Sequence, residues 1–263
     1  MTHRMKKIKR SAAAVLTVLS IVLSTFISAF VITAEQDTAW DGTIADKYDS
    51  GAGTQTKPYI IKNAGQLARL VNDTDTSGKY YTLSADITVN EKLTDSAIPW
   101  YSVAVENGTD AVKGTVFKGH FNGNGHTVSG LYFKGNATDN AYWYAVGLFP
   151  RVDADAVIEN VGVKNSSFTV TGGGQAGAVV GVYSPKSSSA EKYLTVRKCF
   201  ADESVSINCE NAGGIAGALN GAAFVYDCYF TGRLSGNNNG AVYVSGWSET
   251  VHIYRFYSTS KLE

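Results

Sequence analysis

The sequence predicts an all-β protein, a parallel β-helix with a short α-helix capping its N-terminal end. After residue 80 no segment has a helical period, and short β-type runs alternate with turns rich in Gly, Asn, Asp and Ser. Two sequence markers also recur four times in one order, at steps of 27 to 39 residues. Most of these repeats offer two or three strands and are shorter than a propeller blade of about 40 residues, so one β-helix coil for each repeat is favoured.

The first 34 residues indicate export. Five basic residues precede the uncharged stretch 11–32, and the first acidic residue is Glu35. A basic start, an apolar run and a small residue are typical of a secretory signal peptide, and we expect cleavage after Ala34. At about 20 residues the apolar run also matches a bilayer span, so an uncleaved N-terminal anchor is the alternative. Both interpretations place residues 35–263 outside the cell.

Residues 35–82 are expected to form a lead-in and the helical cap. The lead-in is polar and Gly-rich, and Asn63 is a favourable N-cap for the helix that follows it. Three apolar residues share one face of this helix: Leu67, Leu70 and Val71. Asn72 and Asp73 end it. A single amphipathic helix before a long β region is suited to cover the end of a stack of coils.

Residues 83–263 are expected to form the repeats of the β-helix, which with the cap gives about six coils. The first marker is a small apolar segment, aligned on Leu148, Val179, Ile215 and Val242. The second marker is a β-type run, aligned on Asn160, Cys199, Cys228 and Phe256. Coils that stack about 4.8 Å apart would place equivalent residues in ladders along the axis.

The charge balance narrows the choice of partner. The chain has 23 Lys and Arg and 23 Asp and Glu, and without residues 1–34 it has 18 basic and 23 acidic residues, a net charge of −5. This lacks the basic excess of a nucleic-acid-binding protein. It also gives no attraction to anionic membranes. We therefore expect no nucleic-acid partner and no membrane contact beyond the N-terminal segment.

The three cysteines are expected to be structural. Cys199, Cys209 and Cys228 are odd in number and show no metal-binding spacing, which disfavours both a disulfide scaffold and a zinc site. Cys199 and Cys228 share one ladder position in neighbouring repeats. Parallel side chains strain a disulfide, so two buried thiols are expected there. No metal and no cofactor is predicted.

Several segments together resemble a known family. Val146–Phe149, followed by Ile158–Val161, resembles the GLUG-type repeat of bacterial surface proteins. Phe117–Val128 resembles the turn that precedes such repeats, and segments within residues 40–68 resemble their N-terminal lead-in. The resemblance spans roughly residues 40–257 and implies a right-handed parallel β-helix. It further implies an exported, adhesin-like and non-enzymatic role, and it supplies no catalytic residues.

The best candidate binding residues are aromatic. Tyr142, Trp143 and Tyr144 precede the first clear repeat, and such side chains stack on sugars or anchor a protein partner. They are equally suited to filling space between the coils and a loop. Glycans, or a host or bacterial surface protein, are the partners that this interpretation suggests.

Two polar motifs are better explained by turn geometry than by a ligand. His120 and His126 flank Asn and Gly residues, which favour a corner over a metal or glycan site. Residues 73–78 match the first half of a calcium loop. The twelfth position is Ser84 instead of the bidentate Glu that such a loop needs, so a polar turn after the helix is expected.

A polysaccharide-degrading enzyme, similar to a pectate lyase or polygalacturonase, is the alternative function. Such chemistry needs carboxylates gathered on one face with a basic residue nearby. The candidates are Asp153, Asp155, Asp202 and Glu203, with Arg197 and Lys198 close in sequence. Asp is common in turns for conformational reasons alone, so no catalytic residue is assigned.

The sequence therefore favours an exported, non-enzymatic β-helix module of a secreted or cell-surface bacterial protein. Adhesion or ligand binding and a scaffold role are both consistent with it, and an inert spacer is a third possibility. Carboxylates on one outward face favour the enzyme, an aromatic groove favours glycan binding, and a featureless polar face favours the spacer.

Overall fold

The computed structural model describes residues 40–106, 111–113, 115–136, 142–185, 193–244 and 250–262. The export segment predicted in residues 1–34 lies outside this described part. Among the described residues, no helix is both long and apolar enough to cross a membrane.

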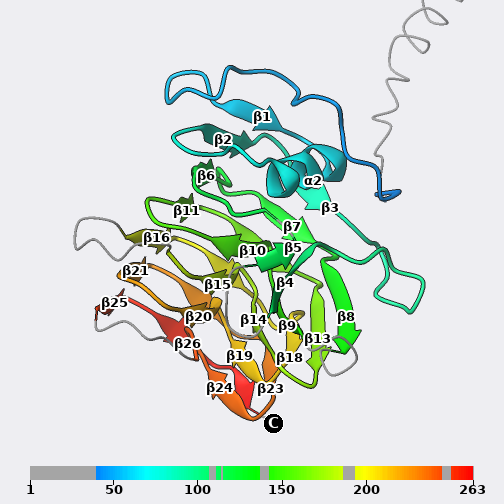
Figure 1. The fold of residues 1–263 in the computed structure, drawn as a ribbon, viewed down its shortest axis with the longest axis vertical. Coiled ribbons are helices and arrows are strands. Elements are labelled where there is room, and N and C mark those ends of the chain that lie inside the picture. Colours follow the sequence, from blue (N-terminus) through cyan, green and yellow to red (C-terminus); the bar gives the residue numbers. More distant parts are fainter. Residues whose placement is uncertain are drawn as a thin grey trace, which may run out of the picture. The chain divides into compact units, whose positions relative to one another are not determined.

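The described chain is a parallel β-helix, which confirms the predicted fold class (Figure 1). Sheet 1 contains β1 (Tyr59–Ile61), β2 (Tyr80–Leu83), β6 (His120–Asn122), β11 (Val157–Glu159), β16 (Leu194–Arg197), β21 (Ala223–Tyr226) and β25 (Val251–Tyr254). Sheet 2 contains β3 (Ile87–Thr88), β7 (Thr127–Ser129), β12 (Gly162–Lys164), β17 (Phe200–Ala201), β22 (Tyr229–Phe230) and β26 (Tyr257–Ser258). Every pair within these two sheets is parallel.

Three further sheets complete the coils. Sheet 3 contains β8 (Tyr132–Asn136), β13 (Ser167–Thr171), β18 (Ser206–Asn208), β23 (Arg233–Ser235) and β27 (Lys261–Leu262). Sheet 4 contains β5 (Ala111–Lys113), β4 (Ser102–Glu106), β9 (Tyr142–Val146), β14 (Gly174–Gly177), β19 (Asn211–Gly213) and β24 (Asn238–Gly240). Sheet 5 contains β10 (Phe149–Val152), β15 (Val180–Tyr183) and β20 (Ala216–Leu219).

A complete coil has five strands, not the two or three that the repeat spacing suggested. The chain visits sheets 1 to 5 in order, as in β6–β10, β11–β15 and β16–β20. Most of these strands have only two to five residues, too short for their period to appear in the sequence. The coils begin at β2, β6, β11, β16, β21 and β25, in agreement with the predicted number.

The N-terminal cap forms as predicted, with α2 spanning Ala64–Asn72. The Asn63 side chain accepts a hydrogen bond from the Gln66 backbone N–H, and Asp73 is the C-cap. The apolar face of α2 is buried in the core cluster, and the helix lies beside β1–β3 at one end of the stack (Figure 1). The expected boundary between residues 82 and 83 falls inside β2, which already belongs to sheet 1.

The core is a set of inward ladders between the sheets. On sheet 1 the paired residues Phe121, Ile158, Val196 and Val225 are buried one above the other. On sheet 3 the equivalent ladder is Phe133, Phe168, Ile207 and Leu234. Since no coil encloses these side chains alone, stacking supplies the burial.

The first sequence marker lies at the corner between sheets 4 and 5, where its glycines form a ladder. The residue pairing places Gly177 beside Gly213, and Gly213 beside Gly240. A Cβ atom on Gly177 would lie 2.3 Å from the Val180 carbonyl oxygen, and one on Gly213 would lie 1.7 Å from that of Ala216. The chain doubles back so tightly that only glycine fits, which explains why the marker recurs.

The second marker contains a one-residue error in the predicted alignment. Gly162 pairs with Phe200, so Val161 is the partner of Cys199, whereas Asn160 was aligned with it. Asn160 instead matches Lys198, because both occupy a left-handed corner, with φ of 54° and 53°. The next two coils repeat this corner with Asp227 and Arg255, at φ of 57° and 48°.

The cysteines are three buried free thiols, as expected for the ladder pair. Cys199 and Cys228 follow the left-handed corner in consecutive coils and point into the core. Burial raises the pKa of Cys199 well above its usual range and raises that of Cys209 to about 12. These thiols therefore act as small core residues.

We expect Lys198→Asn to raise the free energy of unfolding by about 1 kcal/mol, because Asn tolerates the left-handed conformation better than Lys. The measurement is urea unfolding followed by circular dichroism. Lys92→Asn is the matched control, since Lys92 is exposed and has no positive φ. An equal effect of both substitutions would show that the corner conformation is not the cause.

We also expect all three cysteines to resist a thiol reagent such as dithionitrobenzoate in native protein at pH 8. Burial blocks access to all three thiols, and the raised pKa values of Cys199 and Cys209 leave little reactive thiolate at those two positions. Labelling should reach completion only in denaturant. Rapid modification of the native chain would contradict the buried ladder.

Candidate functional site

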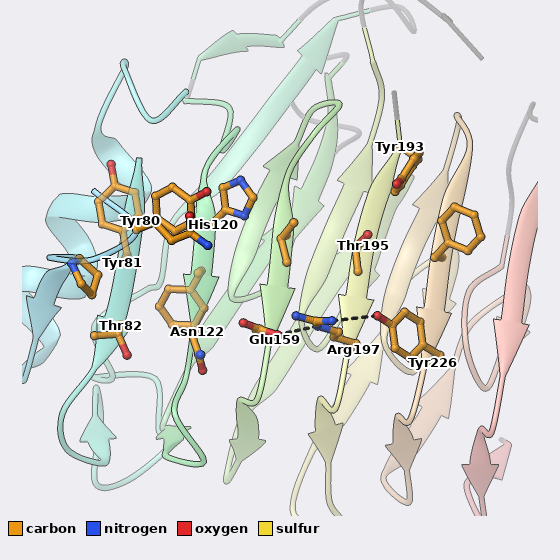
Figure 2. Close-up of a pocket in the computed structure, with 15 residues that line it drawn as sticks. Tyr80, Tyr81, Thr82, His120, Asn122, Glu159, Tyr193, Thr195, Arg197 and Tyr226 are labelled. Atoms are coloured by element: carbon orange, nitrogen blue, oxygen red, sulfur yellow. Dashed lines mark hydrogen bonds and ion pairs between the residues drawn. The ribbon is translucent and has the colours of Figure 1, made fainter. Parts of the chain in front are cut away.

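An open groove of about 690 Å³ runs over the outward face of sheet 1 (Figure 2). Its lining comes mainly from β2, β6, β11, β16 and β21, with Gln55 and Pro58 at one end and Tyr193 beside β16. Because the strands are paired in register, alternate residues of each strand face outward in two rows.

The first row is aromatic at its ends and small in its middle. Residue pairing orders it as Tyr80, His120, Val157, Thr195, Phe224 and His252. The second row is largely polar and runs parallel to it: Thr82, Asn122, Glu159, Arg197, Tyr226 and Tyr254. Val157 and Thr195 have shorter side chains than the aromatic residues on either side, so they form the floor of a slot between the rings.

Aromatic pairs form the two walls of the slot. Tyr80 and His120 stack with ring centroids 4.3 Å apart and planes 9° from parallel. On the opposite wall Phe224 stacks on His252 at 4.9 Å and 12°, while Tyr193 meets Phe224 edge to face at 4.9 Å. Tyr193 is 44% exposed at the rim.

The length of the slot follows from the strand spacing. Three steps along sheet 1 separate His120 from Phe224 in the first row. At about 4.8 Å for each step this is about 14 Å along the helix axis. His120 stacks on Tyr80 and Phe224 stacks on His252, and in both pairs the second ring belongs to the strand outside the slot.

A charged pair lies at the centre of the polar row. The Arg197 Nε–H donates to Glu159 Oε2 at 2.5 Å, and Arg197 Nη1 donates to the Tyr226 hydroxyl at 3.2 Å (Figure 2). The hydrogen bonds to Tyr226 and Glu159 raise the pKa of Arg197 above its usual value. Glu159 and Arg197 come from neighbouring coils and are 38 positions apart in the sequence.

His120 belongs to the groove and lies in strand β6, which corrects its predicted place in a turn. Burial lowers the pKa of His120 below its usual value, and the charges of Glu159 and Asp155 oppose this in part. His120 is thus a neutral ring at pH 7. His126 does lie near the corner, where its Nδ1 is 3.2 Å from Asp86.

The other predicted polar motif forms the expected turn. The Asp75 backbone N–H donates to the Asp73 side chain at 2.9 Å, and this hydrogen bond stabilises the turn that follows α2. Among the residues that the structure describes, no group of three or more His, Cys, Asp or Glu side chains is arranged to hold a metal ion.

The predicted aromatic triplet lies elsewhere in the fold. Tyr142, Trp143 and Tyr144 belong to β9 of sheet 4, and the Tyr144 side chain is not among those that line the groove on sheet 1. Tyr144 is half-buried and packs against Phe133, with ring centroids 5.5 Å apart. The side chains of Tyr142 and Trp143 lie outside the described part of the structure.

The acidic candidates do not gather around Arg197. Asp153 is buried and lies 3.3 Å from Lys118, and Asp202 pairs with Lys164 at 3.8 Å. None of the four predicted carboxylates lines the groove, where Glu159 is the carboxylate among the lining residues. Lys198 occupies a left-handed corner rather than the groove.

The groove residues have a signal in the sequence that the repeat alignment alone does not use. In β2, β6, β11, β16 and β21 the two row residues stand directly beside the buried residue of the strand, as Val157 and Glu159 flank Ile158. A comparison of these flanking positions across the aligned repeats would identify the residues of both outward rows of sheet 1.

Two relatives match about half of this chain. Halomucin of Haloquadratum walsbyi is 33% identical over 145 residues, which are 54% of this chain and 2% of halomucin. A protein assigned as a Gly-rich membrane protein of Evansella cellulosilytica is 30% identical over 134 residues, which are 51% of this chain and 14% of that protein. The chain thus spans a small share of the length of each relative.

A solved structure from Bacteroides ovatus, assigned as an immunoglobulin A1 protease, is 20% identical with a TM-score of 0.46. The comparison covers 82% of this chain and 70% of that one. No family model matches the sequence.

Proposed function

We propose that this chain is an exported cell-surface β-helix module that binds a glycan in the groove of sheet 1 without transforming it. The observation that carries the proposal is the slot itself, in which aromatic rings flank a low floor beside a row of hydrogen-bonding side chains. This groove replaces the residues 142–144 of the sequence-based hypothesis as the candidate site.

The chemistry of the slot suits a sugar chain. The apolar faces of sugar rings pack on aromatic side chains, and sugar hydroxyls both donate and accept hydrogen bonds. His120 and Tyr193 supply rings at the two walls, and Asn122, Glu159 and Tyr226 supply polar atoms along one side. An open groove about 14 Å long admits an extended chain.

Surface location is supported by the sequence and by the relatives. The basic start followed by the uncharged stretch 11–32 is typical of an export segment. One relative is assigned as a membrane protein and the other is named halomucin. A net charge of −5 after residue 34 suits a soluble exported module.

A binding role is favoured over glycoside hydrolysis by the number of carboxylates. Hydrolysis in most glycosidases uses two carboxyl groups about 5 to 9.5 Å apart across the scissile bond. Glu159 alone lines this groove among the described residues, and its carboxylate is engaged by Arg197. The aromatic groove also disfavours an inert spacer, for which a featureless polar face is expected.

We expect Tyr193→Ala and His120→Ala each to weaken glycan binding about five- to tenfold, because each removes one ring face of the slot. The measurement is affinity electrophoresis of the purified chain in gels that contain laminarin, mannan, xylan or polygalacturonate.

Tyr257→Ala is the matched control for these variants. Tyr257 is 61% exposed on sheet 2, outside the groove, so its loss should leave mobility unchanged. Equal retardation of wild type and both groove variants would place the glycan elsewhere. Absence of retardation in every gel would reject the glycan and favour a protein partner.

We expect no turnover of these polysaccharides, with or without calcium. Incubation should produce neither new reducing ends nor unsaturated ends, measured by a reducing-sugar assay and by absorbance near 235 nm. Either product, if lost in Glu159→Gln, would overturn the non-catalytic proposal.

A further inference from the structure

We infer that the groove selects neutral glycans over acidic ones, because among the residues that the structure describes its one cation is ion-paired with its one anion. This inference rests on the proposed glycan-binding function and names the class of glycan. Glu159 and Arg197 are the charged side chains that line the groove, and they are ion-paired with each other.

The geometry engages two of the five N–H donors of the Arg197 guanidinium, among them Nε. Its Nε–H donates to Glu159 and its Nη1 donates to Tyr226, so the side chain bridges two neighbouring coils. A carboxylate binds a guanidinium best through two parallel hydrogen bonds from the same fork. An incoming uronate would have to displace Glu159 to use the fork that includes Nε, and at the remaining Nη donors it would lie close to the Glu159 negative charge.

Glu159 also repels an acidic ligand directly. Its side chain is 18% exposed and that of Arg197 is 40% exposed, and because the two are hydrogen-bonded, an acidic ligand that reaches Arg197 also comes close to the Glu159 carboxylate. A second carboxylate within a few ångströms of it would meet like-charge repulsion that water screens incompletely. The neutral His120 ring offers no compensating positive charge.

A second ion pair lies beyond the polar row. Asp227 and Arg255 form an ion pair through two hydrogen bonds at the corner that follows the polar row. In one of them Arg255 Nη2 donates to Asp227 Oδ2 at 2.8 Å. Gln55 and Pro58 at one end of the groove carry no charge. Sugar hydroxyls, in contrast, need no net charge, and Thr195 and the Asn122 amide can bond to them.

The test asks whether removal of the Glu159 charge changes the preference of the groove from neutral to acidic polysaccharides. Wild type should be retarded by a neutral polysaccharide among laminarin, mannan and xylan, and not by polygalacturonate or alginate at low salt. Glu159→Gln keeps the shape of the side chain and exposes the Arg197 charge. We expect this variant to bind polygalacturonate at least about tenfold more tightly than wild type, with an affinity that falls as salt rises.

Two further variants keep the inference falsifiable. The double variant Glu159→Gln with Arg197→Gln restores a neutral groove and should lose the acquired binding to polygalacturonate. Asp202→Asn removes one negative charge from outside the groove, where Asp202 pairs with Lys164, and should leave the preference unchanged. Thermal unfolding of each variant checks that it is folded.

The outcomes separate this inference from the proposed function. Wild-type binding to polygalacturonate that matches its binding to neutral polysaccharides, and that is lost in Arg197→Gln, would overturn the inference while glycan binding stands. Failure of folded Glu159→Gln to gain acidic binding would also overturn it. No wild-type binding to any polysaccharide would overturn the proposed function and the inference together.

Discussion

The parallel hydrogen bonding from each coil to the next is the constraint on which the rest of this structure depends. It pairs residues one to one along sheet 1, so a side chain's height on the axis and its face are both set by its register. The groove exists because two such rows carry different chemistry, one aromatic at its ends and one polar. A slip of one residue in any strand would turn its groove residues into the core.

The corners maintain this register, and their backbone geometry restricts which residue types can occupy a few positions. Gly177 and Gly213 permit the close turn between sheets 4 and 5, where a Cβ atom would meet backbone. The corner between sheets 1 and 2 holds a left-handed residue in four successive coils, and Asn and Asp suit it better than Lys198 and Arg255. Length differences between repeats are absorbed between these fixed points, so the outward rows stay aligned.

The same stacking builds functional chemistry from residues that are distant in the sequence. Glu159 and Arg197 meet across adjacent coils, and Tyr80 stacks on His120 in the same way. Each pair is fixed by the strand spacing, which preorganises the groove before any ligand arrives. A module of this kind can change its ligand by substitutions in the outward rows while its core and corners remain intact.

The sequence alone determined the fold class, the capping helix that begins after Asn63 and the recurring small apolar marker, because these follow from local propensity, capping and steric fit. It did not determine that each coil has five strands, nor the alignment of Asn160 with Lys198, because strands of two to five residues are too short to show a period. The groove depended on tertiary structure for a similar reason. His120, Glu159 and Tyr193 are ordinary residues in the chain, and only the lateral pairing of coils brings them to one face.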